Sequence, residues 1–189
     1  MMKLLCRTFV GFALLAAVTG PAALAVTVDV YSGIGDYSTG GAPYSGLVGS
    51  FTSPDIMFAT NTGYAWHPFG LGAFGADITG CLDVAADGTY SFTLNSDDGS
   101  LLYIDGSLVV NNGGPHGPWS VTNSASLTAG MHPFEVQFYE DFGGPSGVDL
   151  YLPAGVSYCI PLPAAGWMGM SLMGVIVSGG LLRRNLRRA

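Results

Sequence analysis

The middle of this 189-residue chain lacks basic side chains. All six Lys and Arg residues lie at the two ends, whereas all 13 Asp and Glu residues lie between Asp29 and Asp149. With 13 acids and no Lys or Arg, residues 26–160 carry a formal charge of −13, against −7 for the whole chain. Such a surface does not attract nucleic acid or anionic lipid, and it favours divalent cations. The absence also excludes a lysine Schiff base and a basic clamp for phosphate.

Recognisable catalytic motifs are missing as well. No serine lies in a nucleophile-elbow sequence, and the aspartates have no spacing from which a glycosidase pair can be inferred. His67, His116 and His132 are too far apart in sequence to predict a zinc site, and each precedes a Pro or Gly, which favours loop positions. We therefore predict that the protein is not an enzyme, with an enzyme acting on polysaccharide as the weaker alternative.

Cysteine is scarce. Of the three cysteines, Cys6 lies in a leader that we expect to be removed, which leaves Cys81 and Cys159. In an exported domain two cysteines most simply form one disulfide, worth on the order of 4 kcal/mol for a loop of this length. Two separate buried thiols are the alternative.

Residues 1–25 have the features of a secretory signal peptide. Two basic residues precede an apolar stretch, and the sequence Ala-Leu-Ala at 23–25 is typical of a cleavage site. We predict a signal helix that is removed near Val26. An amino-terminal membrane anchor is the alternative, although the apolar run is short and followed by the cleavage-type sequence.

The last 29 residues, 161–189, differ in character from the middle. An apolar segment at 166–182 is at the lower limit for a transmembrane helix, and the arginines after it favour a cytoplasmic end. The sequence Ile-Pro-Leu-Pro-Ala at 160–164 precedes it. This tail resembles the PEP-CTERM family of bacterial sorting signals in its Val-Pro-Leu-Pro-Ala variant, with isoleucine in place of the leading valine. The resemblance implies processing by an exosortase near a motif of four residues: Pro161, Leu162, Pro163 and Ala164.

Two outcomes are open for this tail. Either the exosortase removes it, or it stays as a permanent single-helix anchor. The expected location is the cell surface or extracellular matrix, with transient or permanent anchoring in the inner membrane.

Between the two ends, the composition predicts an all-β domain at 26–160. Glycine is about twice as frequent as usual, and Val, Thr, Tyr and Phe dominate the remaining runs. We expect eight to ten short strands in two packed antiparallel sheets, a β-sandwich, with residues 32–53 as a long loop and 148–152 as the last strand.

The stretch at 90–112 is the centre of this domain. Alternating apolar residues at 90–95 predict a strand, and two further strands follow at 101–104 and 108–110. Asp105-Gly106 predicts a two-residue hairpin. The sequence Ser-Asp-Asp-Gly at 96–99 predicts a turn in which glycine takes a positive φ and two adjacent carboxylates repel each other unless a cation lies between them.

This stretch, with the segments 127–132 and 136–139, resembles the PA14 domain. The resemblance covers about residues 26–152 and is strongest in the centre. It implies a β-sandwich, and lectin members of the family bind calcium through two successive aspartates joined by a cis peptide. The ion in turn binds sugar hydroxyls. Asp97 and Asp98 match that pair, and Asp141 falls where the lectins usually place a ligand asparagine.

Replacement of that asparagine by Asp141 retains an oxygen ligand, adds charge and removes an amide donor. Calcium binding at Asp97, Asp98 and Asp141 is therefore better supported than carbohydrate binding. The alternative is that the paired aspartates only cap turn amides. Trp119 is a candidate sugar-stacking residue together with Trp66, although such aromatic residues are more often core or loop anchors.

Two functions follow from these predictions. The first is a secreted binding module or adhesin that recognises a glycan or exopolysaccharide through calcium. The second is a structural matrix or surface-coat protein that binds calcium without sugar specificity.

Overall fold

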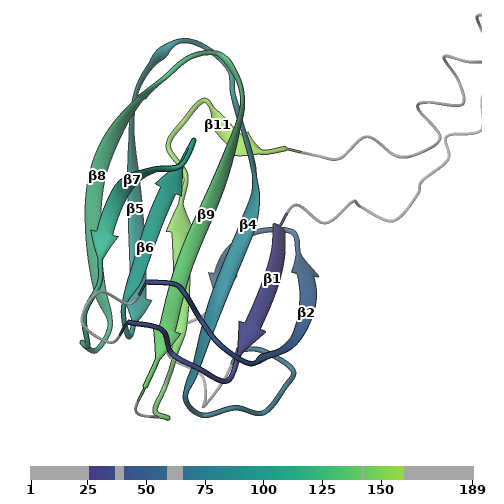
Figure 1. Cartoon of the computed structure of the whole chain (residues 1–189). Helices are drawn as coiled ribbons and strands as arrows, with labels where there is room; N and C mark the ends of the chain where they lie inside the picture. The colour runs from purple at the N-terminus through teal and green to yellow at the C-terminus, as the bar shows by residue number, and fades with distance from the viewer. Residues whose placement is uncertain (1–25, 37–40, 59–65, 142, 160–189) are drawn as a thin grey trace, which may run out of the picture.

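The computed structural model describes residues 26–36, 41–58, 66–141 and 143–159, and these form two antiparallel sheets (Figure 1). The predicted signal peptide, the sorting motif and the apolar segment at 166–182 lie outside the described residues. Within the described ranges, no helix is long and apolar enough to cross a membrane. The strands are β1 Val26–Tyr31, β2 Leu47–Ser53, β3 Met57–Phe58, β4 Phe74–Val84, β5 Gly88–Asp97, β6 Ser100–Ile104, β7 Ser107–Asn112, β8 Trp119–Leu127, β9 Gly130–Glu140, β10 Gly147–Tyr151 and β11 Val156–Tyr158.

The seven-stranded sheet has the order β2-β1-β4-β9-β6-β7, and β11 also pairs with β4. The four-stranded sheet has the order β3-β10-β5-β8. At one side the two sheets are linked by asparagine side chains, since Asn123 Nδ2 donates to Val109 O at 2.8 Å and Asn112 Nδ2 donates to Trp119 O at 3.0 Å. The predicted all-β fold of antiparallel sheets is confirmed.

Apolar and polar residues alternate along the strands, and the apolar side chains form the core between the sheets. In β9, Phe134, Val136 and Phe138 are buried, whereas Glu135 and Gln137 on the opposite face are partly exposed. Each large apolar side chain buried in this way contributes about 1.5–3 kcal/mol. Trp66 is partly buried and packs against this core, because its ring lies edge-on to the buried Phe74 and Phe138 with centroids 5.5 and 5.6 Å away. Trp66 therefore does not form a surface platform with Trp119.

Two strand predictions were wrong. Residues 47–53 were expected in a loop but form β2, which pairs with β1 along its length. Their glycine and serine content gives little local strand preference, so pairing with β1 decides the conformation. The chain also does not end its last strand at 152, because β11 follows and pairs with β4.

The Asp97–Gly99 connection is not a hairpin turn. β5 belongs to the four-stranded sheet and β6 to the seven-stranded sheet, so the chain crosses between sheets at this point. Gly99 does not take the predicted positive φ. A Cβ at this position would instead lie 2.5 Å from the Tyr139 ring and 2.8 Å from Gly114 O. Close packing therefore requires the glycine.

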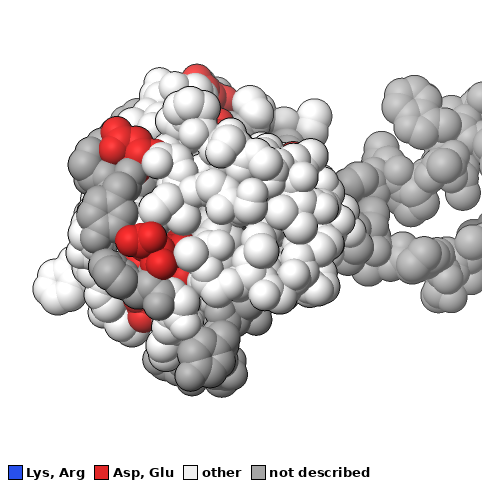
Figure 2. Space-filling model, turned by 60° about the horizontal axis from the view of Figure 1, so that its bottom comes forward, with Lys and Arg blue, Asp and Glu red and all other residues white. Residues whose placement is uncertain are grey.

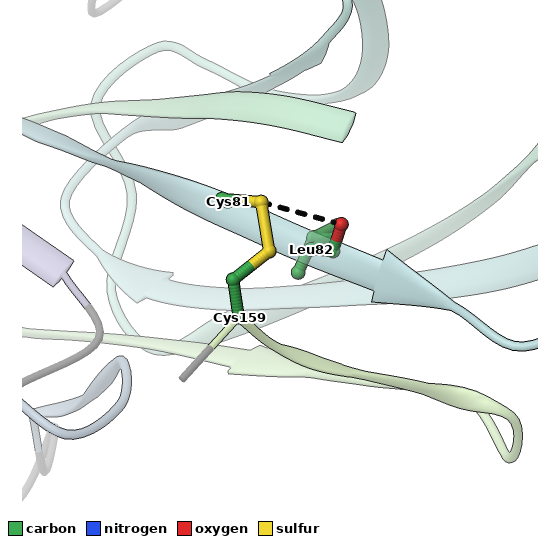
Figure 3. The surroundings of a disulfide bond; sticks show 3 residues. All are labelled: Cys81, Leu82 and Cys159. Carbon is green, nitrogen blue, oxygen red and sulfur yellow. Dashed lines mark hydrogen bonds between the residues drawn. A yellow bond between two sulfur atoms is a disulfide. The ribbon is translucent and has the colours of Figure 1, made fainter. Parts of the chain in front are cut away.

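A disulfide joins Cys81 of β4 to Cys159 just after β11, which confirms the predicted pairing (Figure 3). The two residues are 78 positions apart, and Cys159 N also donates to Cys81 O at 2.8 Å. Val26 is the cross-strand partner of Gly80, so the first and last described residues lie beside each other on β4.

Candidate functional site

The predicted aspartate pair lies at the end of the sandwich opposite the disulfide. Asp97 ends β5, and Glu140 ends β9 as the cross-strand partner of Phe74 at the start of β4. Phe74 and Cys81 are seven positions apart on β4, about 24 Å at the rise of an antiparallel strand. Figure 2 brings this end of the molecule forward and shows acidic side chains, with no Lys or Arg among the residues that are described.

Asp98 joins three segments that are distant in sequence. Its Oδ1 accepts a hydrogen bond from the backbone N–H of His116 at 3.0 Å, and its Oδ2 accepts one from the backbone N–H of Asp141 at 3.1 Å. The side chain is only 4% exposed, and the peptide bond between Asp97 and Asp98 is cis. The loop that carries Asp141, which was predicted to contribute to the site, and the loop after β7, which was not, therefore both contact Asp98.

A buried polar network supports the crossing between the sheets. Ser96 Oγ and Ser100 Oγ lie 2.7 Å apart, and Asn112 Nδ2 donates to Ser96 Oγ at 2.9 Å. The His116 ring lies between two carbonyl oxygens, with Nε2 2.9 Å from Asn112 O and Nδ1 2.8 Å from Gly117 O. These contacts hold the loop after β7 against the aspartates.

A hollow of about 270 Å³ opens beside the aspartate pair. It is lined by acidic side chains and by residues of two loops: Asp97, Asp98, Glu140, His116, Gly117 and Pro145. Burial raises the pKa of Asp97, and the adjacent Asp98 carboxylate raises it further. Negative charge in this hollow is therefore unfavourable without a cation.

Glu140 is the deepest of these acids, with 2% of its surface exposed. Its Oε1 accepts a hydrogen bond from Gly144 N at 3.3 Å, whereas its Oε2 is buried without a hydrogen-bond partner among the described residues. Burial and the Asp98 carboxylate raise the pKa of Glu140 to about 7. A buried carboxylate oxygen beside two aspartates is the kind of ligand that Ca²⁺ accepts.

The structure places the predicted residues as follows. Asp97 and Asp98 line the hollow, and Asp141 contacts Asp98 through its backbone amide, so the ligand role of the Asp141 carboxylate stays a prediction. Trp119 is 64% exposed and begins β8 opposite Ser96, but it does not line the hollow.

Among the described side chains, no three His, Cys, Asp or Glu form a group arranged to hold a metal ion. Ca²⁺ also takes backbone carbonyl oxygens and water.

Two ionisable residues of the hollow, Glu140 and His116, were not predicted. Glu140 follows Phe134, Val136 and Phe138 at a spacing of two, so its position in the strand already implies an inward side chain. An acid at the end of such a series is a signal for a buried functional carboxylate. His116 carried no such signal, because its approach to Asp98 depends on the path of the loop after β7. His132 also differs from prediction, since it lies in β9 rather than in a loop.

A protein-family comparison identifies the fold. Residues 32–160 match the family model of the PA14 domain. The chain is a member of the PA14 domain family. No curated protein matches the chain.

Several solved structures share this fold. The PA14 domain of the MpAFP antifreeze protein is 16% identical, with a TM-score of 0.57 over 78% of this chain and 92% of that one. The PA14 sugar-binding domain from an RTX adhesin is 19% identical, with a TM-score of 0.52 over 74% and 95%. The A domain of epithelial adhesin 9 from Candida glabrata, in complex with Galβ1-4GlcNAc, is 15% identical, with a TM-score of 0.50 over 72% and 86%.

Some matches are to longer proteins. The chain spans 45% of an anti-sigma factor domain-containing protein and 16% of a β-glucosidase from Kluyveromyces marxianus. At these identities the comparisons concern the fold.

Proposed function

We propose that this PA14 domain is a secreted, non-enzymatic binding module that recognises carbohydrate through a calcium ion held at the aspartate pair. Asp97 and Asp98 would supply carboxylate ligands, with Glu140, the Asp141 carboxylate and loop carbonyls as the remaining oxygen donors. When bound, the ion would supply positive charge and open coordination positions for sugar hydroxyls.

The observation that carries this proposal is the contact between Asp98 and both loops. Each carboxylate oxygen has two lone pairs, so Asp98 can accept its two backbone hydrogen bonds and still offer a lone pair to a cation. The raised pKa values of Asp97 and Glu140 add support, because a cation would remove the repulsion among these carboxylates. Two domains of similar structure are the PA14 sugar-binding domain from an RTX adhesin and an epithelial adhesin domain in complex with a disaccharide.

Titration calorimetry of CaCl₂ into the calcium-free protein tests the ion site. We expect wild type to bind Ca²⁺ and Asp97→Asn to lose at least about tenfold in affinity, since a charged ligand becomes neutral. Asp97 is the position to change because Asp98 also holds the loops. Asp83→Asn, which removes an exposed carboxylate elsewhere on the domain, is the matched control. Equal calcium responses in wild type and Asp97→Asn would contradict the proposal.

A glycan array with and without EDTA tests the sugar. Discrete hits that vanish with the chelator support a calcium-dependent lectin.

A matrix or surface-coat protein is the second candidate. The observation that favours it is Asp141, which offers no amide donor to a sugar. Calcium binding in the calorimeter with an empty glycan array would select this function.

We place the domain at the cell surface or in the extracellular matrix, exported by residues 1–25 and processed by an exosortase at 161–164. Mass spectrometry of the mature protein tests this route. Retention of the arginines at 183–188 would mean that the tail is a permanent anchor.

A further inference from the structure

A second hollow, of about 250 Å³, opens on the outer face of the seven-stranded sheet. Its lining includes Thr79 of β4, Glu135 and Pro133 of β9, and Tyr103 of β6. These side chains are exposed or partly exposed and alternate with buried residues that face the core. The hollow is therefore a feature of the solvent face, separate from the sandwich interior.

Strand register places three different chemical groups side by side in this hollow. Thr79 is the cross-strand partner of Glu135, and Glu135 is the cross-strand partner of Tyr103. Directly opposed side chains in antiparallel strands are about 5 Å apart at Cβ. A hydroxyl, a carboxylate and an aromatic ring therefore form a row across three strands. Glu135 Oε1 is oriented by a hydrogen bond from Gln137 Nε2 at 2.6 Å.

Further carboxylates lie close to this row, and no basic side chain among the described residues neutralises them. Asp77 lies two positions before Thr79 on β4 and therefore on the same face, and Asp29 of β1 is its cross-strand partner. Burial raises the pKa of Asp77 to about 7, with further contributions from Glu135 and Asp29. Among the described residues there is no Lys or Arg to compensate them. The nearest histidine in sequence, His132, is already paired with Asp105 at 2.6 Å.

We propose that this hollow binds a protonated amine carried on a sugar-sized ring, namely an amino-sugar residue of a partly deacetylated polysaccharide. The Glu135 carboxylate accepts a charge-assisted hydrogen bond from the ammonium group. The Tyr103 ring contacts the apolar face of the sugar and attracts the cation. Thr79 supplies a hydroxyl for the ring substituents. The volume is below that of pockets for drug-sized ligands, so one monosaccharide unit is the appropriate size.

This site is independent of the candidate calcium site. The Thr79–Glu135 pair is five positions along β4 and β9 from the Phe74–Glu140 pair, about 17 Å at the rise of a strand. Binding at the hollow therefore does not require calcium. It is expected to persist in EDTA whether or not the calcium proposal holds.

An NMR titration of the ¹⁵N-labelled protein in EDTA tests this inference, with glucosamine as the probe and N-acetylglucosamine as the control that lacks the charge. We expect glucosamine to shift the amide signals of Thr79, Tyr103 and Glu135 and to bind at least about tenfold more tightly than N-acetylglucosamine. The affinity should fall with added salt.

Substitutions of the lining residues test whether glucosamine binds in this hollow. Glu135→Gln should weaken glucosamine binding about tenfold, and Tyr103→Leu should also weaken it because it removes the aromatic ring and retains an apolar side chain. Asp83→Asn makes the same charge change as Glu135→Gln on an exposed part of β4 and should bind like wild type. Signals outside the hollow report that each variant is folded. Equal binding of the two sugars, unchanged binding by Glu135→Gln, or equal weakening by Asp83→Asn would overturn the proposal.

Discussion

Asp98 and Glu140 are both buried acids at the end of the sandwich, but their surroundings differ. Asp98 accepts two backbone hydrogen bonds, one from each loop. Glu140 Oε1 accepts a hydrogen bond from Gly144 N, whereas its Oε2 has no hydrogen-bond partner in the described part of the chain. The carboxylate of Asp98 therefore stabilises the loops, whereas the carboxylate of Glu140 is unfavourable in the calcium-free fold.

Glu140→Gln should therefore stabilise the calcium-free protein at alkaline pH. The pKa of Glu140 is raised from its usual 4.5 to about 7, so the folded state favours the neutral form. Wild type loses stability as pH rises from about 4.5 to 7, by up to about 3 kcal/mol for a shift of this size. Glutamine does not ionise, so this loss is absent in the variant.

Urea denaturation in EDTA at pH 5 and pH 8 measures this effect. We expect similar midpoints near pH 5 and a higher midpoint for Glu140→Gln at pH 8. Asp83→Asn, which removes an exposed carboxylate, should change the midpoint little at either pH. Equal destabilisation of Glu140→Gln at both pH values would contradict the inference that the ionised Glu140 side chain destabilises the calcium-free fold.

At the scale of elements, the β6–β7 hairpin shows where local sequence was sufficient. Asp105 and Gly106 have φ values of 52° and 74°, as a type I′ turn requires. Asp and Gly are residues that accept positive φ, so the turn is encoded where it occurs. β2 and β11 lack such local signals. Their conformation depends on pairing with β1 and β4, which are distant in sequence.

The same hairpin carries a pH-dependent contact. His132 Nδ1 lies 2.6 Å from Asp105 Oδ2, and its Nε2 lies 2.9 Å from Thr128 O. The hydrogen bond with Asp105, followed by that with Thr128, raises the pKa of His132. Because the folded pKa is raised, the stabilisation is fully present below about pH 6.5 and is lost as pH rises through the folded value.

Asp105→Asn should remove most of this pH dependence, because asparagine retains the positive-φ turn and lacks the charge. Half of the Asp105 side chain is exposed, so the expected effect is on the order of 1 kcal/mol or less. Stability measured from pH 5.5 to 9 should fall more steeply in wild type than in Asp105→Asn. Parallel curves would show that the pair does not contribute.

At the scale of the whole molecule, the disulfide joins the segment after β11 to strand β4 of the seven-stranded sheet. β11 has three residues, and the disulfide follows directly after it. Without this bond the segment would depend on few backbone contacts. Replacing both Cys81 and Cys159 with alanine should lower the free energy of unfolding by about 4 kcal/mol, through the greater entropy of the unfolded chain.

Denaturation of the double variant against wild type measures this loss. Wild type treated with a reductant should lose a similar amount, which separates the covalent bond from the change in side chains. An unchanged midpoint in both cases would mean that the disulfide does not constrain the unfolded chain.

The sequence by itself determined the fold class, the two-residue hairpin at Asp105-Gly106, the disulfide pairing and the acidic character of residues 26–160. These follow from alternation, turn chemistry, residue count and charge, all of which are local or additive. It also singled out Asp97 and Asp98, since two adjacent carboxylates before a glycine are visible without a fold.

Tertiary structure decided which groups surround those carboxylates. The crossing between sheets and the backbone hydrogen bonds from His116 and Asp141 to Asp98 depend on contacts between distant segments. The row of Thr79, Glu135 and Tyr103 likewise exists only through the register of three strands. Such contacts depend on strand pairing and loop paths, and no local pattern specifies either.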